Sequence, residues 1–271
     1  MALKRFRFLM RWVRVDVIRT IEIRKIVDNL APVRELFQNI NGKCQKHYTV
    51  SRYAILDEML WAFKGRCRFR MYLPNKPARY GLKVFSLVDS RTFAIYNMEI
   101  YCSTQLTGPF AVSNDTSDVV NRLCFPLSKS RRNITMESWF TSVAAAEDLP
   151  KNHDLTIVGT LRKDKKQIPL DFFTKRPPKT SMFGFLQDKT IVSYIQTRNK
   201  NVILLSTIHH DYSIDPNSGE DIKPEIITFY NTTKCGVDTV NQLSSKYNVA
   251  RNTHRWPMVI FYSLFNITGI N

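Results

Sequence analysis

The sequence of 271 residues lacks the features of a membrane or secreted protein. No stretch approaches the about 18 uninterrupted apolar residues that a membrane-spanning helix needs. The N-terminal stretch MALKRFRFLMRWVRVDVIRT interrupts each apolar run with arginine, so we expect no secretory signal there. Internal repeats and low-complexity tracts are also missing. We therefore expect a soluble intracellular protein that has no membrane partner.

Cysteine is scarce, and its spacing matches no common motif. The five cysteines are far apart in the sequence, and none belongs to a C-x-x-C pair. This pattern favours reduced, mostly buried thiols over a disulfide framework or a zinc site. The adjacent histidines His209 and His210 make a poor metal site, because neighbouring residues on a strand face opposite sides.

Acidic residues are too few to balance the basic ones. Lysine and arginine total 40 against 23 aspartates and glutamates, which gives a formal net charge of +17. The basic residues form five clusters, and the cluster over residues 63–83 interleaves them with aromatic rings. Basic groups bind phosphates and aromatic rings stack on bases, so a polyanion is favoured as partner, with nucleic acid ahead of a membrane surface. A solvated surface explains one such cluster but explains five poorly.

We predict that a basic face of the protein binds DNA through phosphates, with little dependence on base sequence. The predicted contact residues are Lys64, Arg66, Arg68, Arg70, Lys76, Arg79, Arg131 and Arg132. A basic protein–protein scaffold without a nucleic-acid role is the alternative from a different class.

The first half of the chain reads as helices followed by strands. Residues 1–50 are mostly helical in pattern, since apolar residues between positions 33 and 40 recur at helical spacing after a proline. From residue 53 the texture changes, and three β-rich runs predict an antiparallel meander. A mixed α/β layer arrangement is expected, because the next predicted elements are a helix over 113–124, a strand over 133–135, a second helix and a strand over 155–163.

The second half begins with a polar, proline-punctuated stretch over residues 165–181, which predicts a linker or an exposed loop. Strands are expected after it, including one over KPEIITFYNT (residues 223–232), and they suggest a β-rich insertion. Two helices are predicted to close the chain, over residues 236–249 and 255–270. In the last helix, the apolar residues expected along one face are Met258, Phe261, Tyr262 and Phe265.

Three acids stand where predicted strands or helices begin or end, each in an apolar setting. They are Asp57 in the first strand, Glu137 after the strand over 133–135, and Asp238 at the start of a helix. A buried carboxylate is unfavourable unless it is paired or bound to a metal, and three converging carboxylates repel one another. A divalent cation relieves that repulsion, and hard oxygen ligands select Mg²⁺ or Mn²⁺. From spacing alone, salt bridges and helix caps stay open as explanations.

Several stretches of this sequence resemble the piggyBac family of transposases and transposase-derived proteins. They follow the family's order and cover nearly the whole chain: LDEML-x-x-FKGRCRFRMYLPNKPARYGLK, NIT-x-x-x-WFTS, LTIVGTLRK-x-K-x-x-IP, YN-x-TK-x-GVDTVNQ and R-x-THRWPM. The resemblance implies a ribonuclease-H-like α/β core of the DDE type, a mixed sheet flanked by helices with a β-rich insertion between the second and third acids. It also implies that Asp57, Glu137 and Asp238 are the catalytic acids and metal ligands.

The resemblance further implies a function. Members of this family cleave DNA at transposon ends and join those ends to TTAA target sites. We therefore expect a transposase that depends on Mg²⁺ or Mn²⁺, acts on DNA in the nucleus and can form a homodimer. The implied division of the chain is a helical segment over residues 1–50, a first core part over 51–170, the insertion over 171–224 and a last core part over 225–271.

Two positions depart from the family's pattern. The second acid is usually the aspartate of CDNWF, whereas this sequence reads MESWF and has Glu137. The extra methylene moves the carboxylate oxygens by about an ångström or more, whereas catalytic geometry tolerates about 0.5 Å. The family also commonly has an acid three residues after the third one, and here that position is Asn241, on the same helix face as Asp238. We expect Asn241 to offer the metal a neutral oxygen and to weaken its binding.

Relative to this family the chain is short at both ends. It begins within what resembles the helical dimerisation and DNA-binding segment and stops in the helix after the third acid, without a cysteine-rich C-terminal domain. We expect a fragmentary or decaying transposon copy, or a host-adopted derivative. The prediction is a degenerate or weakly active transposase, and the alternative is a catalytically silent DNA-binding protein derived from one.

Overall fold

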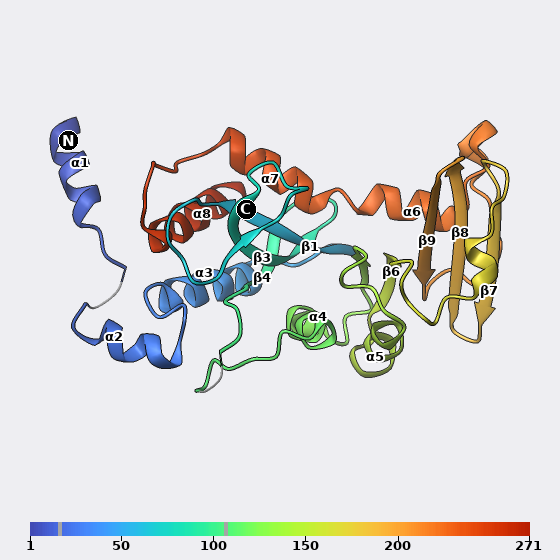
Figure 1. Ribbon diagram of the computed structural model, residues 1–271, viewed down its shortest axis with the longest axis horizontal. Helices are drawn as coiled ribbons and strands as arrows, with labels where there is room; N and C mark the ends of the chain where they lie inside the picture. Colours follow the sequence, from blue (N-terminus) through green and yellow to red (C-terminus); the bar gives the residue numbers. More distant parts are fainter. Residues whose placement is uncertain (16–17, 106–107) are drawn as a thin grey trace.

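One mixed β-sheet lies at the centre of the molecule (Figure 1). The computed structural model describes residues 1–15, 18–105 and 108–271, so the predicted helical positions 16–17 lie outside the described residues. Within the described part of the chain, the strand order is β2-β3-β1-β5-β6-β9-β8-β7, with β4 paired to β3. The strands are β1 (Tyr53–Ala62), β2 (Arg70–Tyr72), β3 (Tyr80–Asp89), β4 (Ile95–Ile100), β5 (Asn133–Met136), β6 (Thr156–Thr160), β7 (Ser181–Leu186), β8 (Lys189–Thr197) and β9 (Lys200–Ser206). The α-helices are α1 (Leu3–Trp12), α2 (Ile18–Val27), α3 (Arg34–His47), α4 (Thr116–Cys124), α5 (Val143–His153), α6 (Glu225–Thr233), α7 (Gly236–Lys246) and α8 (Trp256–Ile270).

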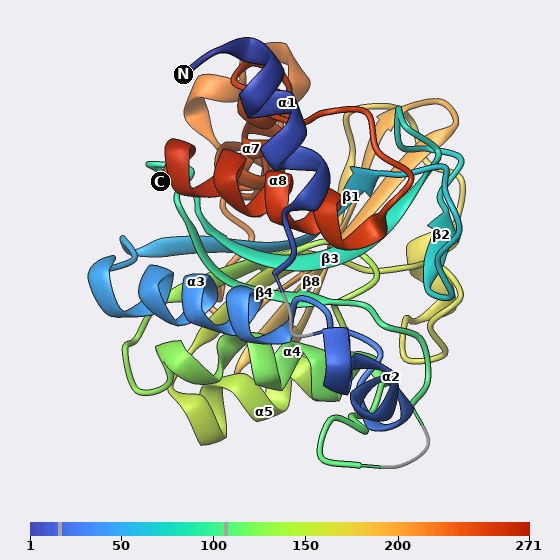
Figure 2. The ribbon, with the colours of Figure 1, turned by 90° about the vertical axis from the view of Figure 1, so that its left-hand side faces the viewer.

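The helical character of the N-terminal segment is confirmed by α1, α2 and α3. Helix α3 runs along β4, where Asn41 donates to Asn97 Oδ1 at 2.9 Å and accepts from the Met98 N–H at 2.9 Å. The residue after α1 contacts the residue before α8, because Arg255 donates to the Val13 carbonyl at 3.0 Å. In the view of Figure 2, α1 stands in front of α8.

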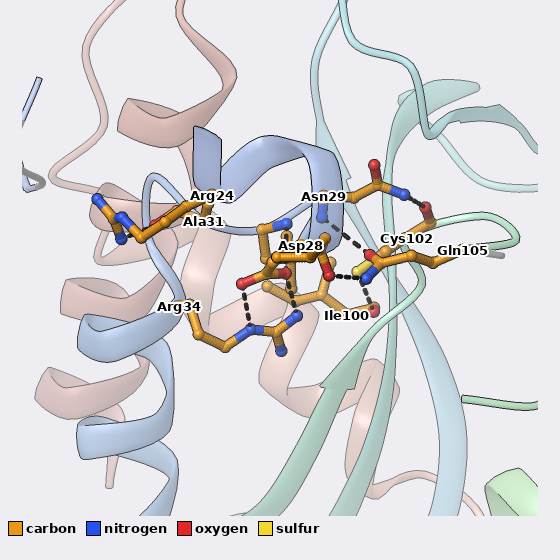
Figure 3. Close-up of polar contacts among 10 residues, drawn as sticks. Arg24, Asp28, Asn29, Ala31, Arg34, Ile100, Cys102 and Gln105 are labelled. Carbon is orange, nitrogen blue, oxygen red and sulfur yellow. Dashed lines mark hydrogen bonds and ion pairs between the residues drawn. The ribbon is translucent and has the colours of Figure 1, made fainter. Parts of the chain in front are cut away.

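A buried ion pair fixes the turn between α2 and α3 (Figure 3). Asp28 is 3 % exposed, and Arg34 donates to its two carboxylate oxygens at 2.6 and 3.0 Å. The side chain of the next residue, Asn29, donates to the Cys102 carbonyl at 3.0 Å. The backbone N–H of Asn29 donates to the side-chain oxygen of Gln105 at 3.0 Å. These contacts tie the N-terminal helices to the chain that follows β4.

The predicted antiparallel meander is confirmed. Strand β1 pairs with β3 from Ala54↔Asp89 to Ala62↔Gly81, and β3 pairs with β4. A further strand that was not predicted, β2, has three residues and pairs with β3 beyond the β3–β4 ladder. Strand β5 joins the other side of β1 in parallel and β6 joins β5 in parallel, so that α5 is the crossover between β5 and β6.

Alternation along β1 sends its side chains into two hydrophobic cores. Ala54 and Leu56 pack with α4 and α5, whereas Ile55 and Met59 pack with α3, α7 and α8. Figure 2 shows α7 and α8 on one side of β3, with α4 and α5 on the other. Full burial of each such side chain contributes about 1.5–3 kcal/mol, so the two cores hold β1 firmly from both sides. By this alternation, Asp57 belongs to the face that α7 covers.

The prediction of a strand over residues 223–232 is wrong, because this stretch forms α6. Its β-branched residues favour a strand locally, but tertiary packing overrides that preference. Ile226, Ile227 and Tyr230 are buried at helical spacing against Val158 of β6 and Leu204 of β9. Helix α6 therefore covers the sheet where a strand would leave this face open.

The β-rich stretch between the second and third acids extends the central sheet. Strand β9 pairs with β6 from Val158↔Ser206 to Thr160↔Leu204, and β8 and β7 follow in antiparallel order. Within the stretch predicted as a linker or loop, residues Leu170–Phe173 form a short 3-10 helix. The boundaries proposed for the insertion remain a prediction.

Helix α8 buries a different set of residues from the one predicted. Met258 and Tyr262 are buried as expected, but Phe265 is 50 % exposed. Ile260 and Leu264 are buried in its place. The helix is apolar nearly all round, so apolar spacing alone does not select the buried face.

All five cysteines are free thiols, as their spacing predicts. The expectation that most are buried holds in part, because Cys124 is buried, Cys44, Cys67 and Cys102 are half-buried, and Cys235 is exposed. Across the described ranges, no helix has the length and apolar character required to cross a membrane.

Candidate active site

Asp57 and Glu137 are neighbours because of the register between β1 and β5. The two strands pair in parallel from Tyr53↔Asn133 to Leu56↔Met136, and the ladder stops there. Asp57 and Glu137 are the next residue on each strand, at the point where the strands separate. Adjacent strands lie about 4.8 Å apart, so this register places the two acids side by side at the end of the ladder.

Asp57 is buried, and it forms no ion pair with the residues that the structure describes. Asp57 is only 3 % exposed, and its Oδ1 accepts a hydrogen bond from the Glu58 N–H at 2.6 Å. Burial, followed by the negative charge of Glu137, raises the pKa of Asp57 to about 8, although the charge of Lys76 acts in the opposite direction. A carboxyl group with this pKa is mostly protonated at neutral pH, and a cation placed beside it would favour its charged form.

Glu137 is half-buried, and its surroundings also disfavour the charged form of its carboxyl group. Burial raises its pKa, and the charges of Glu58 and Asp238 add to this effect. Lys76 and Lys234 lower the pKa of Glu137 without cancelling the rise. The negative charges of Glu58 and Asp238 therefore both act on Glu137, and negative charge accumulates around it.

Gly236 lets the third acid approach the first two. A Cβ at this position would lie 2.7 Å from Ile55 Cγ2, closer than real Cβ atoms come to a neighbour, so the start of α7 packs directly on β1. Asp238 follows in the first turn of α7, where the positive end of the helix dipole favours a carboxylate. Asp238 is exposed, and its charge acts on Glu137 as described.

Asp238 and Asn241 line a cleft of about 1080 Å³. The cleft lies among the end of β1, the loop between β1 and β3, α7, α8 and the chain that joins them; its other polar or charged lining residues include Lys64, Lys76, Gln242, Asn248, Arg251 and Asn252. Asn241 is one turn after Asp238, as the helical spacing predicts. The cleft thus brings an acid, an amide and several basic groups to one concave surface.

Lys76 is the predicted DNA-contact residue that reaches the acids. Its ammonium donates to the Glu58 carbonyl at 3.0 Å and lies 3.9 Å from Glu58 Oε1. Both side chains of this pair are about four-fifths buried, at 22 % and 19 % exposure. Glu58 itself is a further acid of the site that the sequence analysis missed, although it directly follows Asp57.

The other basic residues between β1 and β3 are mostly at the surface. Lys64, Arg66, Arg68 and Arg79 are exposed, as a phosphate-binding face requires. Arg70 is committed to the loop itself, because it donates to the carbonyls of Lys64 and Gly65 at 2.7 and 2.8 Å. Hydrogen bonds of Arg70 therefore stabilise the loop, while the other four basic side chains are exposed to solvent.

Arg131 and Arg132 are not brought together with this face. They precede β5, whereas Glu137 follows it, so the length of the strand separates them from the acids. Arg132 donates to the carbonyls of Val50 and Ser51 at 2.9 Å each, and Arg131 pairs with Asp154 at 3.3 Å. These contacts give Arg132 a structural task that the sequence did not indicate.

Lys83 is a second cation that the sequence analysis did not single out at the site. Its ammonium lies over the rings of Trp139 and Phe85, 4.6 and 4.8 Å from their centres, and these rings stack on each other. Burial lowers the pKa of Lys83, while Glu58 raises it. The position of Lys83 could not be predicted because it depends on the pairing of β3 with β1, which are distant in the sequence.

The residues present fit a divalent cation. Mg²⁺ is commonly held by one or two carboxylates together with water and substrate phosphates, and Asp57 and Glu137 supply two carboxylates with raised pKa values. Among the described residues, no three His, Cys, Asp or Glu side chains lie close enough to hold one ion jointly. Asp57 and Glu137 would therefore hold the ion together with water and phosphate oxygens, and Asp238 would face it from α7 without forming a three-carboxylate cluster with them.

Two comparisons with known proteins show the family of the chain. A family model described as "Transposase IS4" matches residues 1–271. The chain belongs to the piggyBac-type DDE transposase family. It is similar to the structure described as "Cryo-EM structure of piggyBac transposase synaptic complex with hairpin DNA (SNHP)", with a TM-score of 0.92 and 38 % sequence identity. The match covers 100 % of this chain and 56 % of that one, so the chain spans little more than half of that transposase's length.

The likeness confirms the predicted fold. The mixed sheet flanked by helices is the ribonuclease-H-like core of a piggyBac-type DDE transposase domain. DDE transposases generally use a divalent metal. The roles of the individual site residues remain a prediction.

Proposed function

We propose that this chain cleaves and transfers DNA strands in a metal-dependent reaction, with Asp57, Glu137 and Asp238 as its catalytic acids. The observation that carries the proposal is the register of β1 and β5, which ends just before Asp57 and Glu137. Gly236 supports it, because it allows the α7 start that carries Asp238 to pack on the same strand. Transposon ends and TTAA sites are the proposed substrates.

The carboxylates would hold the cation, and Mg²⁺ or Mn²⁺ suits their hard oxygen atoms. When bound, such an ion activates the attacking oxygen and stabilises the departing 3′ oxygen of the phosphodiester. By its burial and position Asp57 would be the central ligand, with Glu137 at the end of β5 and Asp238 on α7 as the other acids. Asn241 can add a neutral oxygen from the same face of α7.

DNA would lie along the cleft beside the acids. Lys64 lines it, and the exposed Arg66, Arg68 and Arg79 belong to the same loop between β1 and β3. Their charge binds phosphates irrespective of base sequence. A synaptic complex holds DNA ends together, so we propose a homodimer that acts on DNA in the nucleus.

The reaction would be weak in this chain. Glu137 carries one methylene more than aspartate, and Asn241 replaces a negative charge beside Asp238, so both departures lower the affinity for the cation. The same two residues favour the second candidate, a catalytically silent transposase-derived protein that still binds DNA. The two candidates differ in strand cleavage and agree in DNA binding.

A strand-cleavage assay distinguishes them. Labelled duplexes that carry piggyBac-type ends are incubated with the chain and Mg²⁺ or Mn²⁺, beside Asp57→Asn as the inactive control. Weak nicking that Asp57→Asn abolishes supports the enzyme. Binding of the duplex without nicking, both in this chain and after Glu137→Asp and Asn241→Asp together, supports the silent DNA-binding protein.

A further inference from the structure

Lys76 stands apart from the other basic residues of its loop. Lys64, Arg66 and Arg68 are exposed, whereas the Lys76 side chain is 22 % exposed and points toward β1. Its Nζ donates to the Glu58 carbonyl at 3.0 Å, so the ammonium is held over the strand that carries Asp57. An ammonium in such a position loses part of its hydration and is stabilised by nearby carboxylates.

The Lys76 ammonium lies near one acid and interacts electrostatically with two others. Glu58 Oε1 lies 3.9 Å from Nζ, and the charge of Lys76 also acts on the carboxyl groups of Asp57 and Glu137, in each case as the strongest opposing charge. Lys76 additionally lines the cleft that contains Asp238. Lys76 is therefore the cation with the strongest effect on Asp57 and Glu137, and Lys234 acts more weakly on Glu137.

The backbone around Lys76 is a closed turn over residues 73–79. The Lys76 N–H donates to the Leu73 carbonyl at 3.1 Å, the Arg79 N–H donates to the Lys76 carbonyl at 2.9 Å, and the Leu73 N–H donates to the Arg79 carbonyl at 2.7 Å. Arg79 has a positive φ of 55°, which closes the turn. Because these bonds join the backbone of the turn, a shift of the Lys76 backbone would carry the exposed Arg79 with it.

We propose that Lys76 is a positioning residue that competes with the divalent cation for Asp57, Glu58 and Glu137. Without the ion, the ammonium neutralises the acids and holds the turn over them. When the ion binds, like charges repel, Lys76 leaves the carboxylates, and the turn over residues 73–79 is released toward the cleft. This inference rests on the proposed metal-dependent function.

The consequence is a link between ion binding and DNA binding. A released Lys76 and the exposed Arg79 face the cleft together, and phosphate oxygens replace the carboxylates as partners of the ammonium. Coupling of this kind is reciprocal, so DNA that engages Lys76 would raise the affinity for the ion by the same factor that the ion raises the affinity for DNA.

The experiment measures Mn²⁺ binding by electron paramagnetic resonance for the whole chain and for four variants. Lys76→Met should bind Mn²⁺ about tenfold more tightly, because the variant lacks a positive charge that competes with the ion for the carboxylates. Lys76→Arg keeps the charge and should bind as the unaltered chain does. Lys64→Met removes a lysine from the same loop and cleft and should change the affinity by less than about twofold, because exposed charges are screened. Asp57→Asn should abolish the binding.

Hydrogen exchange supplies the second readout. In the unaltered chain, Mn²⁺ should speed the exchange of amides in residues 73–79, whereas in Lys76→Met these amides should exchange fast with or without Mn²⁺. If Lys76→Met does not fold, the response of the unaltered chain to Mn²⁺ decides. Unchanged affinity in Lys76→Met, or exchange of the turn that does not respond to Mn²⁺, overturns the role of Lys76 while the metal site stands. If the unaltered chain has no Mn²⁺ site that depends on Asp57, the proposed function fails together with this inference.

Discussion

Gly236 packs against Ile55 so closely that a Cβ on the glycine would lie 2.7 Å from Ile55 Cγ2. This contact joins the start of α7 to β1, two residues before Asp57 on one element and two residues before Asp238 on the other. The distance between these acids therefore depends on a position where no side chain fits. A glycine that looks like a helix-breaking residue in the sequence is instead the contact that assembles the site.

The first prediction concerns this contact. Gly236→Ala should destabilise the fold by about 1–3 kcal/mol, because the added methyl overfills a packed core, and should weaken Mn²⁺ binding by moving Asp238. Urea denaturation and Mn²⁺ titration measure the two effects. Gly42→Ala is the matched control, since a Cβ at Gly42 in α3 meets nothing within 4 Å. That change should stabilise the helix by about 0.5–1 kcal/mol and leave Mn²⁺ binding unaltered. Equal effects of both changes would contradict the account.

The second prediction is a pH dependence that originates at Asp57. Its pKa is about 8 in the fold against 3.8 for an unperturbed aspartate, so the folded state binds the proton more tightly than the unfolded state. The resulting stability is fully present below about pH 4 and is lost as the pH rises through about 8, a change on the order of a few kcal/mol without metal. Asp57→Asn should show a flatter profile of unfolding free energy between these pH values. Parallel profiles of the two proteins would refute the assignment.

The third prediction concerns the two departures from the family's pattern. Glu137→Asp and Asn241→Asp together should raise Mn²⁺ affinity and the rate of strand cleavage by about tenfold or more, because they restore a shorter ligand and a negative charge. Cleavage of labelled duplexes with piggyBac-type ends measures the rate, and Asn241→Ser controls for loss of the amide without added charge. Robust cleavage by the unaltered chain would show that these positions do not impair it.

The fourth prediction separates two arginines that look alike in the sequence. Arg66→Ala should lower affinity for DNA and reduce the steepness of its salt dependence by about one charge, with little change in stability. Arg132→Ala should leave DNA affinity unaltered and destabilise the fold by about 1–3 kcal/mol, because the carbonyls of Val50 and Ser51 lose their donor. Fluorescence anisotropy between 50 and 200 mM salt, as suits a phosphate-driven interface, and urea denaturation give the two readouts. The reverse assignment of effects would contradict the placement of both residues.

Sequence reasoning reached the fold where local pattern and family resemblance agree. The meander of β1, β3 and β4, the helices on either side and the positions of Asp57, Glu137 and Asp238 on their elements could all be read from spacing and motif. It failed where packing decides. The β-branched residues of α6 favour a strand by themselves, and the burial of Ile226 and Tyr230 against the sheet is what makes them helical.

The site was harder to predict than the fold because its contacts are long-range. Charge patterning grouped Lys76 with the exposed arginines, yet its ammonium reaches back to β1, and the same patterning put Arg132 in the DNA face although it bonds backbone carbonyls at the other end of β5. Net charge favours a polyanionic partner. It does not report which basic side chains face solvent and which hold the fold together.

The most direct test of the central claim is an experimental structure of the chain with Mn²⁺, in which anomalous scattering at the manganese edge locates the ion. We expect a peak bonded to carboxylate oxygens of both Asp57 and Glu137, at about 2.0–2.3 Å, with Asp238 turned toward it from α7. The same experiment on Asp57→Asn should lose the peak. A peak elsewhere on the surface, or carboxylates of Asp57 and Glu137 more than about 10 Å apart, would contradict a shared metal site at the end of β1 and β5.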